Sequence, residues 1–464
     1  MTTATPSIPN PRVFREYDIR GVADRDLPDA FARDLGRAIG TTLARAGVRR
    51  MALGRDCRVS SARLHAALLE GLLATPLHVI DVGLVATPVL YFAPFHLECD
   101  GGVQITGSHN PPEDNGFKVL KGKTTIFGAE IQKLRALMES GHYTGGTGTY
   151  EQRDVSAAYV EHARARIALG PRRPKVVVDA GNGMGGLVGV PLYRALGFDV
   201  VPLHCEMDGR FPNHHPDPTV EKNVADLKAA LVREQAEIGI AWDGDADRIG
   251  VVDAKGRIVW GDQLMILFAR AILAEQPGAT FVSEVKCSQA LYDEIERAGG
   301  KAIMWKVGHS LIKAKMKETG ALLAGEMSGH IFFAHRYLGY DDAVYAGARL
   351  LELCSRETRT LAELVDTLPR MVNTPEIRVE VPDDLKFKVV ALATERLRAR
   401  YPVVDVDGVR VKFPGAGGGW GLVRASNTQP ALVLRFEAGT PERLAEIRRI
   451  VEDELAAVRA ELGA

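Results

Sequence analysis

The chain of 464 residues is too long for one hydrophobic core, and its 46% apolar and 25% charged residues are ordinary for globular domains. Its 58 basic and 59 acidic residues nearly balance, which gives no sign of nucleic acid or an anionic membrane as a partner. The five cysteines lack Cys-x-x-Cys spacing, and neither a signal peptide nor a run of ~18 apolar residues is found, so we expect no disulfides, no zinc and a cytoplasmic location.

The first part of the chain alternates between helical and strand-like patterns. Apolar residues recur at helical spacing over residues 31–43 and 64–72, whereas residues 51–54 and 78–82 read as buried strands. This alternation is typical of a parallel sheet covered by helices.

A polar loop follows the next predicted strand, at residues 101–105. Its sequence, Thr-Gly-Ser-His-Asn-Pro-Pro over residues 106–112, cannot continue a strand, because each proline lacks an N–H donor and restricts the residue before it. Ser108 and His109 are therefore expected on a stiff loop at a strand end. They are either plain surface groups or, together with Lys118, parts of a site.

An acidic loop follows a second strand and helix series that begins near residue 175. The sequence Trp-Asp-Gly-Asp-Ala-Asp-Arg places Asp243, Asp245 and Asp247 at alternate positions, which point the same way in an extended loop. Three such carboxylates repel one another unless a cation neutralises them, and oxygen ligands suit Mg²⁺. A solvated acidic turn is the alternative. A calcium loop is excluded, because its sixth and twelfth positions hold Arg248 and Ala254 instead of Gly and Glu.

A glycine-rich stretch in the same series imitates a dinucleotide site. Residues 181–186 satisfy Gly-x-Gly-x-x-Gly after a predicted strand. The acidic residue that should end the next strand is instead Asp199, which precedes the strand at residues 200–203. We interpret these glycines as turn packing and expect no dinucleotide.

The alternation returns a third time, from the strand at residues 280–284 to the loop that contains Glu326. We therefore predict a threefold repeat with one functional loop per copy, at the strand ends where open α/β sheets bind ligands. The fold class that we predict is α/β: three similar domains with mixed or parallel sheets at residues 1–150, 151–256 and 257–368, and a smaller α+β domain at residues 369–464.

Two further polar stretches suit a phosphorylated sugar. Arg424, Ser426, Asn427 and Thr428 combine a guanidinium, two hydroxyls and an amide, which suit a phosphate dianion, although the same residues can form a polar turn. The carboxylate of Glu326 can accept hydrogen bonds from two sugar hydroxyls.

These stretches together resemble the signatures of the α-D-phosphohexomutase family, most closely its bacterial phosphomannomutase/phosphoglucomutase branch. The motifs occur in the order Thr-Gly-Ser-His-Asn-Pro, Asp-Gly-Asp-x-Asp-Arg, Gly-Glu-Met-Ser-Gly-His at residues 325–330 and Arg-Ala-Ser-Asn-Thr-Gln-Pro at residues 424–430. The resemblance implies a central cleft between the domains. It also implies a phosphoryl group carried by Ser108.

The resemblance places residues from the whole chain at the site. It implies that Ser108, Asp243, Asp245 and Asp247 bind Mg²⁺ and that Ser108, His109, Lys118, Arg20 and Arg248 are catalytic. The substrate-binding residues that it implies are Tyr17, Lys286, Gly308, His309, Glu326, Met327, Ser328, Gly329, His330, Arg424, Ala425, Ser426, Asn427 and Thr428.

The function that we predict is interconversion of hexose 1-phosphate and hexose 6-phosphate, of mannose, glucose or both. It uses a phosphoserine and a 1,6-bisphosphate intermediate, with Mg²⁺ and glucose or mannose 1,6-bisphosphate as cofactors. The general base is left open between His109, Lys118 and His309. A sugar-phosphate phosphatase that uses the same serine and a non-catalytic sensor are the alternatives. We expect sugar phosphates as the only partners and favour a monomer.

Overall fold

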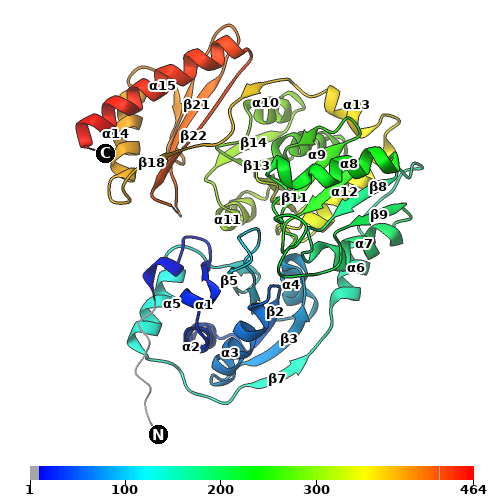
Figure 1. Cartoon of the computed structure of the whole chain (residues 1–464), viewed down its shortest axis with the longest axis vertical. Helices are drawn as coiled ribbons and strands as arrows, with labels where there is room; N and C mark the ends of the chain where they lie inside the picture. Colours follow the sequence, from blue (N-terminus) through cyan, green and yellow to red (C-terminus); the bar gives the residue numbers. More distant parts are fainter. Residues whose placement is uncertain (1–9, 428, 464) are drawn as a thin grey trace. The chain divides into compact units, whose positions relative to one another are not determined.

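The structure is a computed structural model of the chain and describes residues 10–427 and 429–463. These residues form two compact units. The first consists of the described residues up to Gly261 together with Ser328–Asp366, and the second of Asp262–Met327 together with the described residues from Thr367 onward. Figure 1 traces the chain from its N-terminus to its C-terminus.

One mixed sheet of the first unit has the strand order β1-β5-β4-β2-β3-β7, with β6 on β5. Its strands are β1 (Ile19–Val22), β2 (Arg50–Arg55), β3 (His78–Leu84), β4 (Gly101–Ile105), β5 (Asp114–Lys121), β6 (Thr124–Thr125) and β7 (Thr149–Gln152). Strand β2 is parallel to β3 and β4, whereas β4 is antiparallel to β5. The strands predicted near residues 51, 78 and 101 are confirmed.

Helices cover this sheet as the apolar spacing predicted. They are η1 (Pro11–Val13), α1 (Ala23–Asp26), α2 (Asp29–Arg45), α3 (Ser61–Leu73), α4 (Thr87–His96) and α5 (Ala129–Ser140). Helices α2 and α3 lie side by side (Figure 1), and Leu35, Leu64 and Leu68 enter one core with strand residues Met51 and Val103. Burial of these side chains supplies the main driving force for this packing, at roughly 25 cal/mol per Å² of apolar surface.

A second sheet of the first unit has the order β12-β11-β10-β8-β9. Its strands are β8 (Val176–Asp179), β9 (Val200–Leu203), β10 (Ile238–Trp242), β11 (Ile249–Asp253) and β12 (Ile258–Val259). Strands β8, β9 and β10 run parallel, and β11 returns antiparallel to β10. The loop between β10 and β11 thus corresponds to the loop between β4 and β5, which agrees with the predicted repeat.

The first unit contains further helices and one further strand in addition to its two sheets. They are α6 (Ser156–Arg164), α7 (Gly185–Ala195), η2 (Glu221–Val224), α8 (Ala225–Glu234), β16 (Ile331–Phe333), α12 (Ala343–Arg356) and α13 (Leu361–Asp366). The glycine-rich stretch before α7 is required by packing, because a Cβ on Gly183 would lie 2.6 Å from the Gly244 carbonyl oxygen and one on Gly185 would lie 2.5 Å from the Trp242 ring. This agrees with the prediction of turn packing.

The second unit begins with parallel strands β13 (Thr280–Glu284), β14 (Lys301–Trp305) and β15 (Leu323–Gly325). Their helices are α9 (Gly261–Glu275), α10 (Gln289–Arg297) and α11 (His309–Thr319). The order of strands and helices repeats that of the first unit, as the sequence predicted.

An antiparallel sheet completes the second unit, in the order β17-β22-β21-β20-β19 with β18 on β22. Its elements are β17 (Val372–Asn373), β18 (Ile377–Glu380), α14 (Lys386–Arg398), β19 (Val403–Val404), β20 (Val409–Lys412), β21 (Trp420–Ala425), β22 (Ala431–Ala438) and α15 (Pro441–Leu462). Helices α14 and α15 lie together against the sheet (Figure 1), which makes this part α+β as predicted.

A buried arginine fastens the two parts of the second unit to each other. The guanidinium of Arg410 donates to the carbonyl oxygens of Val285 (2.7 Å) and Cys287 (2.8 Å), and it stacks 3.8 Å from the Trp420 ring centroid. A buried charge with these contacts favours one orientation, because another would leave its Nη donors without partners.

Candidate active site

The serine loop and the acidic loop of the first unit meet. Ser108 Oγ donates a hydrogen bond to Asp243 Oδ2 over 2.7 Å, although 135 positions separate the two residues. Ser108 is 2% exposed, and the three aspartates of the acidic loop are fully buried. The structure thus brings together the hydroxyl and the acidic group that the sequence singled out.

A buried arginine shapes the serine loop. The guanidinium of Arg58 donates to four backbone carbonyl oxygens of this loop. They belong to Ser108 (2.7 Å), Asn110 (2.6 Å), Pro111 (2.5 Å) and Asp114 (2.9 Å). The guanidinium supplies donors to these carbonyls in a loop where prolines forbid regular structure. Arg58 therefore holds the loop in one conformation.

Both loops contain a residue in the left-handed region of backbone conformation. Ser108 has φ +49° and Ala246 has φ +63°, which side chains other than glycine rarely adopt. Such strain is maintained by surrounding contacts and concentrates at functional sites. At Ser108 one of these contacts is the hydrogen bond from its N–H to Thr106 Oγ1, 2.9 Å long.

The acidic loop is a turn and not the extended segment that we predicted. The N–H groups of Asp247 and Arg248 both donate to Asp243 Oδ1 over 3.1 Å, which folds the loop back on itself. The carboxylates nevertheless converge, because Asp243, Asp245 and Asp247 each place one oxygen within 4.8 Å of the others. The convergence was predicted correctly, but its cause is the turn at Ala246.

The acidic loop fits a hard divalent cation. Among the described residues, Asp245 Oδ1 and Asp247 Oδ1 are buried oxygens without a hydrogen-bond partner. Buried acceptors normally have partners, and a set of carboxylate oxygens is what Mg²⁺ prefers. Burial, and then the charges of Asp245 and Asp247, raise the pKa of Asp243 well above its ordinary value. A bound cation would relieve that repulsion.

Lys118 supplies a positive charge beside these carboxylates. Its Nζ lies 2.9 Å from Asp245 Oδ2 and also contacts Asp247. Burial alone would lower the pKa of Lys118, but Asp245 and Asp247 outweigh it and raise the pKa well above its ordinary value. The ammonium is thus held in its charged form, which suits a partner for anionic oxygens better than a base.

His109 is held in its neutral form, in contrast to the charged Lys118. Its Nδ1 lies 3.1 Å from Ser108 Oγ. Burial, followed by the charges of Arg248 and Arg20, lowers the pKa of His109 well below its ordinary value. The ring is therefore neutral near pH 7 and can accept a proton from the serine hydroxyl.

Two arginines lie near His109 and contribute to lowering its pKa. Arg20 donates to Asn110 Oδ1 over 2.7 Å and pairs with Asp18 at 2.5 Å, so it is bound to the serine loop. Arg248 donates from Nε to His330 Nε2 over 3.0 Å. Both guanidiniums raise the positive potential at His109, beside Ser108.

His330 belongs to the predicted sugar-binding loop, but its side chain lies beside the acidic loop. Its Nδ1 lies 3.1 Å from Asp341 Oδ2 and 3.7 Å from Asp247 Oδ1. With Arg248 on its other nitrogen, the ring is oriented from both sides. Gly329 beside it has φ +91°, and a Cβ there would lie 2.3 Å from the Ile249 carbonyl oxygen, so glycine is required.

Sequence analysis did not identify Arg58, Thr87 and Asp341. Thr87 Oγ1 donates to Asp245 Oδ2 over 2.5 Å, while Arg58 and Asp341 orient Ser108 and His330. Arg58 and Thr87 follow the ends of β2 and β3, the sheet edge at which ligands are expected, and this position was the available signal. Asp341 carries no comparable signal, because it pairs with Phe332 in an isolated β-bridge and follows no predicted strand.

The second unit brings together three other predicted stretches. Glu326 Oε1 accepts a hydrogen bond from the Gly308 N–H over 2.7 Å, beside His309. Asp407 accepts from Arg424 Nε (3.1 Å) and from the Val307 N–H (3.0 Å). The expected sugar-binding loop and phosphate-binding arginine are thus linked through Asp407.

The other predicted substrate residues occupy varied positions. Lys286 Nζ lies 3.4 Å from Glu376, the Met327 N–H donates to Glu284 over 3.3 Å, and Ser426 Oγ accepts from the Gln429 N–H over 3.2 Å. Ala425 ends β21, Asn427 is exposed, and Tyr17 and Ser328 are half-buried in the first unit. Thr428 lies outside the described residues.

Models of the phosphoglucomutase/phosphomannomutase family match the chain in four consecutive stretches. The alpha/beta/alpha domains I, II and III match residues 11–144, 157–256 and 260–371, and the C-terminal domain matches residues 376–454.

Known proteins resemble the chain along nearly its whole length. A "Phosphomannomutase/phosphoglucomutase" of Pseudomonas aeruginosa is 46% identical over 462 residues, 99% of each protein, and a "Phosphoglucomutase" of Neisseria gonorrhoeae is 46% identical over 94% of this chain and 95% of its own length. A solved structure of a phosphoglucomutase/phosphomannomutase family protein from Burkholderia thailandensis is 42% identical, with a TM-score of 0.91 over 97% of this chain and 98% of the other. Within the described residues, no helix combines the length and the apolar character that crossing a membrane requires.

Proposed function

The chain belongs to the phosphoglucomutase/phosphomannomutase family, and from this membership we propose that it interconverts the 1-phosphate and the 6-phosphate of glucose, mannose or both through a phosphoserine at Ser108. It is an enzyme of the isomerase class, as its relatives' names state. The observation that carries the proposal is the contact of 2.7 Å between Ser108 Oγ and the acidic loop.

Mg²⁺ is the cofactor that the acidic loop suits. Ser108, Asp243, Asp245 and Asp247 would hold it, since they offer a hydroxyl and carboxylate oxygens, two of them buried without hydrogen-bond partners among the described residues. When bound, Mg²⁺ would offset the negative charge of the transferring phosphoryl group.

Each transfer moves one proton between a sugar hydroxyl and Ser108 Oγ. A sugar hydroxyl attacks the phosphorus of phospho-Ser108, its new O–P bond forms and the bond from phosphorus to Ser108 Oγ breaks, while the hydroxyl's proton ends on Ser108 Oγ. The second transfer reverses these events with the other phosphate of the bisphosphorylated sugar. His109 is the group that we assign to hold this proton, because its neutral ring lies 3.1 Å from Ser108 Oγ.

Lys118, Arg20 and Arg248 stabilise the phosphoryl oxygens in this proposal. Phosphoryl transfer relies mainly on positioning and electrostatics, and these three cations are the charged groups around Ser108 that can provide both. Lys118 acts as a fixed charge, since its two aspartate partners keep it protonated.

The second unit supplies groups suited to the rest of a sugar phosphate. Arg424, Ser426, Asn427 and Thr428 would bind the phosphate that does not react, and Glu326 would bind sugar hydroxyls, assisted by Lys286, His309 and Met327. Glucose or mannose 1,6-bisphosphate is the intermediate and activator in this scheme. We also expect a monomer, which light scattering in solution tests.

The test of the function separates a mutase from a phosphatase. The purified chain is incubated with glucose 1-phosphate, Mg²⁺ and a trace of glucose 1,6-bisphosphate, and in parallel with mannose 1-phosphate and its bisphosphate. We expect the 6-phosphate to form without inorganic phosphate from at least one of the two sugars. Release of inorganic phosphate without 6-phosphate would instead identify a phosphatase.

A further inference from the structure

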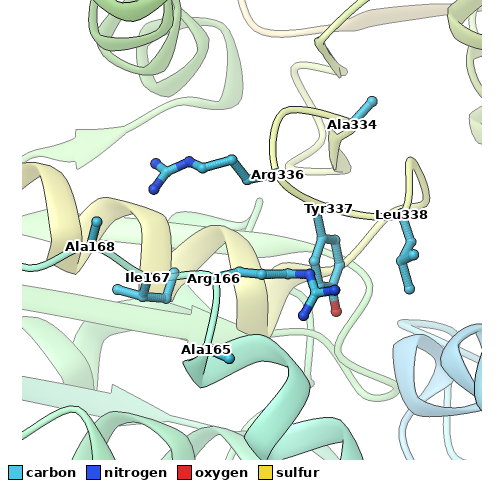
Figure 2. Close-up of a pocket in the computed structure, with 8 residues that line it drawn as sticks. All are labelled: Ala165, Arg166, Ile167, Ala168, Ala334, Arg336, Tyr337 and Leu338. Carbon is cyan, nitrogen blue, oxygen red and sulfur yellow. The ribbon is translucent and has the colours of Figure 1, made fainter.

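A surface pocket of about 630 Å³ lies in the first unit, and no residue of the site described above lines it. Residues 165–168, which follow α6, form one wall, and Ala334 with residues 336–338, which follow β16, form the other (Figure 2). This volume lies in the range of roughly 300–1,000 Å³ that small-molecule sites occupy.

Arg166 contributes a guanidinium to this pocket. Its Nη1 donates to the His162 carbonyl oxygen over 2.9 Å, and among the described residues it forms no ion pair. Figure 2 shows its side chain extending along the pocket toward Tyr337. A guanidinium that has a backbone contact but no carboxylate keeps most of its donors available for an anion.

The carboxylate of Glu352, which contacts Arg336 and Ala168 of the pocket wall, is engaged by other groups. Glu352 is a buried carboxylate that accepts from Arg336 over 2.6 Å and from the Ala168 N–H over 3.0 Å. The same carboxylate lies 3.8 Å from Arg349 and 3.6 Å from Arg356. Glu352 is thus held by three guanidiniums and a backbone N–H, so its carboxylate does not occupy Arg166.

The walls of the pocket are partly apolar and rigid. Ile167 and Leu338 present aliphatic side chains on opposite sides (Figure 2). Tyr337 is held in place, because its ring stacks 3.7 Å from the Tyr345 ring and its hydroxyl donates to Asp342 Oδ2 over 2.7 Å. A preformed wall of this kind lowers the entropy that binding costs.

We propose that this pocket binds a small organic anion, a carboxylate or a phosphate monoester, with its charged group on Arg166 and its apolar part between Ile167 and Leu338. Guanidiniums bind both types of anion through paired N–H donors, so the two share one recognition chemistry. The site is separate from the catalytic reaction and does not depend on it.

The test uses the full chain and three matched probes: benzoate, phenyl phosphate and uncharged benzyl alcohol, each measured by isothermal titration calorimetry. We expect at least one of the two anions to bind and benzyl alcohol not to bind. Arg166→Ala should weaken binding of that anion about tenfold or more, since it removes the charge-assisted contact. Arg166→Lys, which keeps the charge, should retain part of the affinity.

The matched control is Arg164→Ala. Arg164 is the last residue of α6, two positions before Arg166, and pairs with Glu161 over 2.9 Å. It does not line the pocket, so its loss should leave the affinity unchanged. Phenyl phosphate that binds near Ser108 would be unaffected by Arg166→Ala, which separates the two sites. Equal affinity in Arg166→Ala and wild type, tight binding of benzyl alcohol, or no binding of either anion would each overturn the proposal. These outcomes do not depend on turnover, so they are independent of the proposed mutase activity.

Discussion

Ser108 Oγ and Asp243 Oδ2 lie 2.7 Å apart, each in a loop that joins a parallel strand to an antiparallel one. Neither sheet of the first unit holds both residues, so the site exists only because the two sheets pack together. Close packing is visible at Gly244, where a Cβ would lie 2.4 Å from the Ser108 carbonyl oxygen.

Ser108→Ala tests the proposed nucleophile. We expect kcat to fall by about four orders of magnitude or more, because covalent catalysis has no substitute for the hydroxyl. Intact mass spectrometry should detect one phosphoryl group on wild type incubated with glucose 1,6-bisphosphate and none on the variant. Ser140→Ala, at the exposed end of α5, is the control and should behave like wild type. Full activity of Ser108→Ala would disprove the phosphoserine.

Metal removal tests the acidic loop. Chelation with EDTA should abolish turnover, and added Mg²⁺ should restore it. Asp245→Asn should weaken Mg²⁺ binding, measured directly by calorimetry, by at least about tenfold, because it replaces a buried ligand while Lys118 keeps its pair with Asp247. Asp226→Asn, an exposed residue of α8, should leave Mg²⁺ binding unchanged. Activity that survives chelation would contradict the assignment.

Gly244→Ala tests the approach of the two loops. The new Cβ would meet the Ser108 carbonyl oxygen, so the serine loop must move and kcat should fall by about a hundredfold, as misplaced reacting groups cause. Gly145→Ala is the matched control, since a Cβ there meets no atom within 4 Å. Thermal melting checks that both variants fold. Unchanged kcat in a folded Gly244→Ala would show that the tight contact is not needed.

The raised pKa of Asp342 predicts that the stability of the fold depends on pH. Burial raises the pKa of Asp342 to about 6, although the Tyr345 N–H and the hydroxyls of Tyr337 and Tyr159 lower it. The folded state therefore binds a proton more tightly than the unfolded state, so this group's contribution to the free energy of unfolding falls as pH rises from about 4 to about 6. Asp342→Asn keeps an acceptor for the Tyr345 N–H. It should reduce the loss in the free energy of unfolding between pH 4 and pH 6 by about 2 kcal/mol.

The measurement is urea unfolding at several values of pH between 4 and 7. Asp100→Asn, at an exposed position of the first unit, controls for the loss of one negative charge and should leave the slope as it is. If Asp342→Asn and wild type lose stability in parallel over this interval, the pKa of Asp342 is not raised.

Local pattern was enough for the secondary structure and for the chemistry of the loops. Apolar residues at helical spacing predicted α2 and α3, and short apolar runs predicted β2 and β3, because these periodicities follow from backbone geometry. The acidic triplet and the serine loop were likewise identified from neighbouring residues, and four ordered motifs indicated the family before any coordinates were considered.

Folding in three dimensions decided the contacts on which the chemistry depends. Arg58 holds carbonyls of the serine loop that are 50 to 56 positions away, and Thr87 donates to Asp245 across 158 positions. The charged state of Lys118 and the neutral state of His109 also arise from burial among distant groups. Spacing along a chain determines which side chains share a face, whereas the partner of a buried polar group depends on which loops packing brings together.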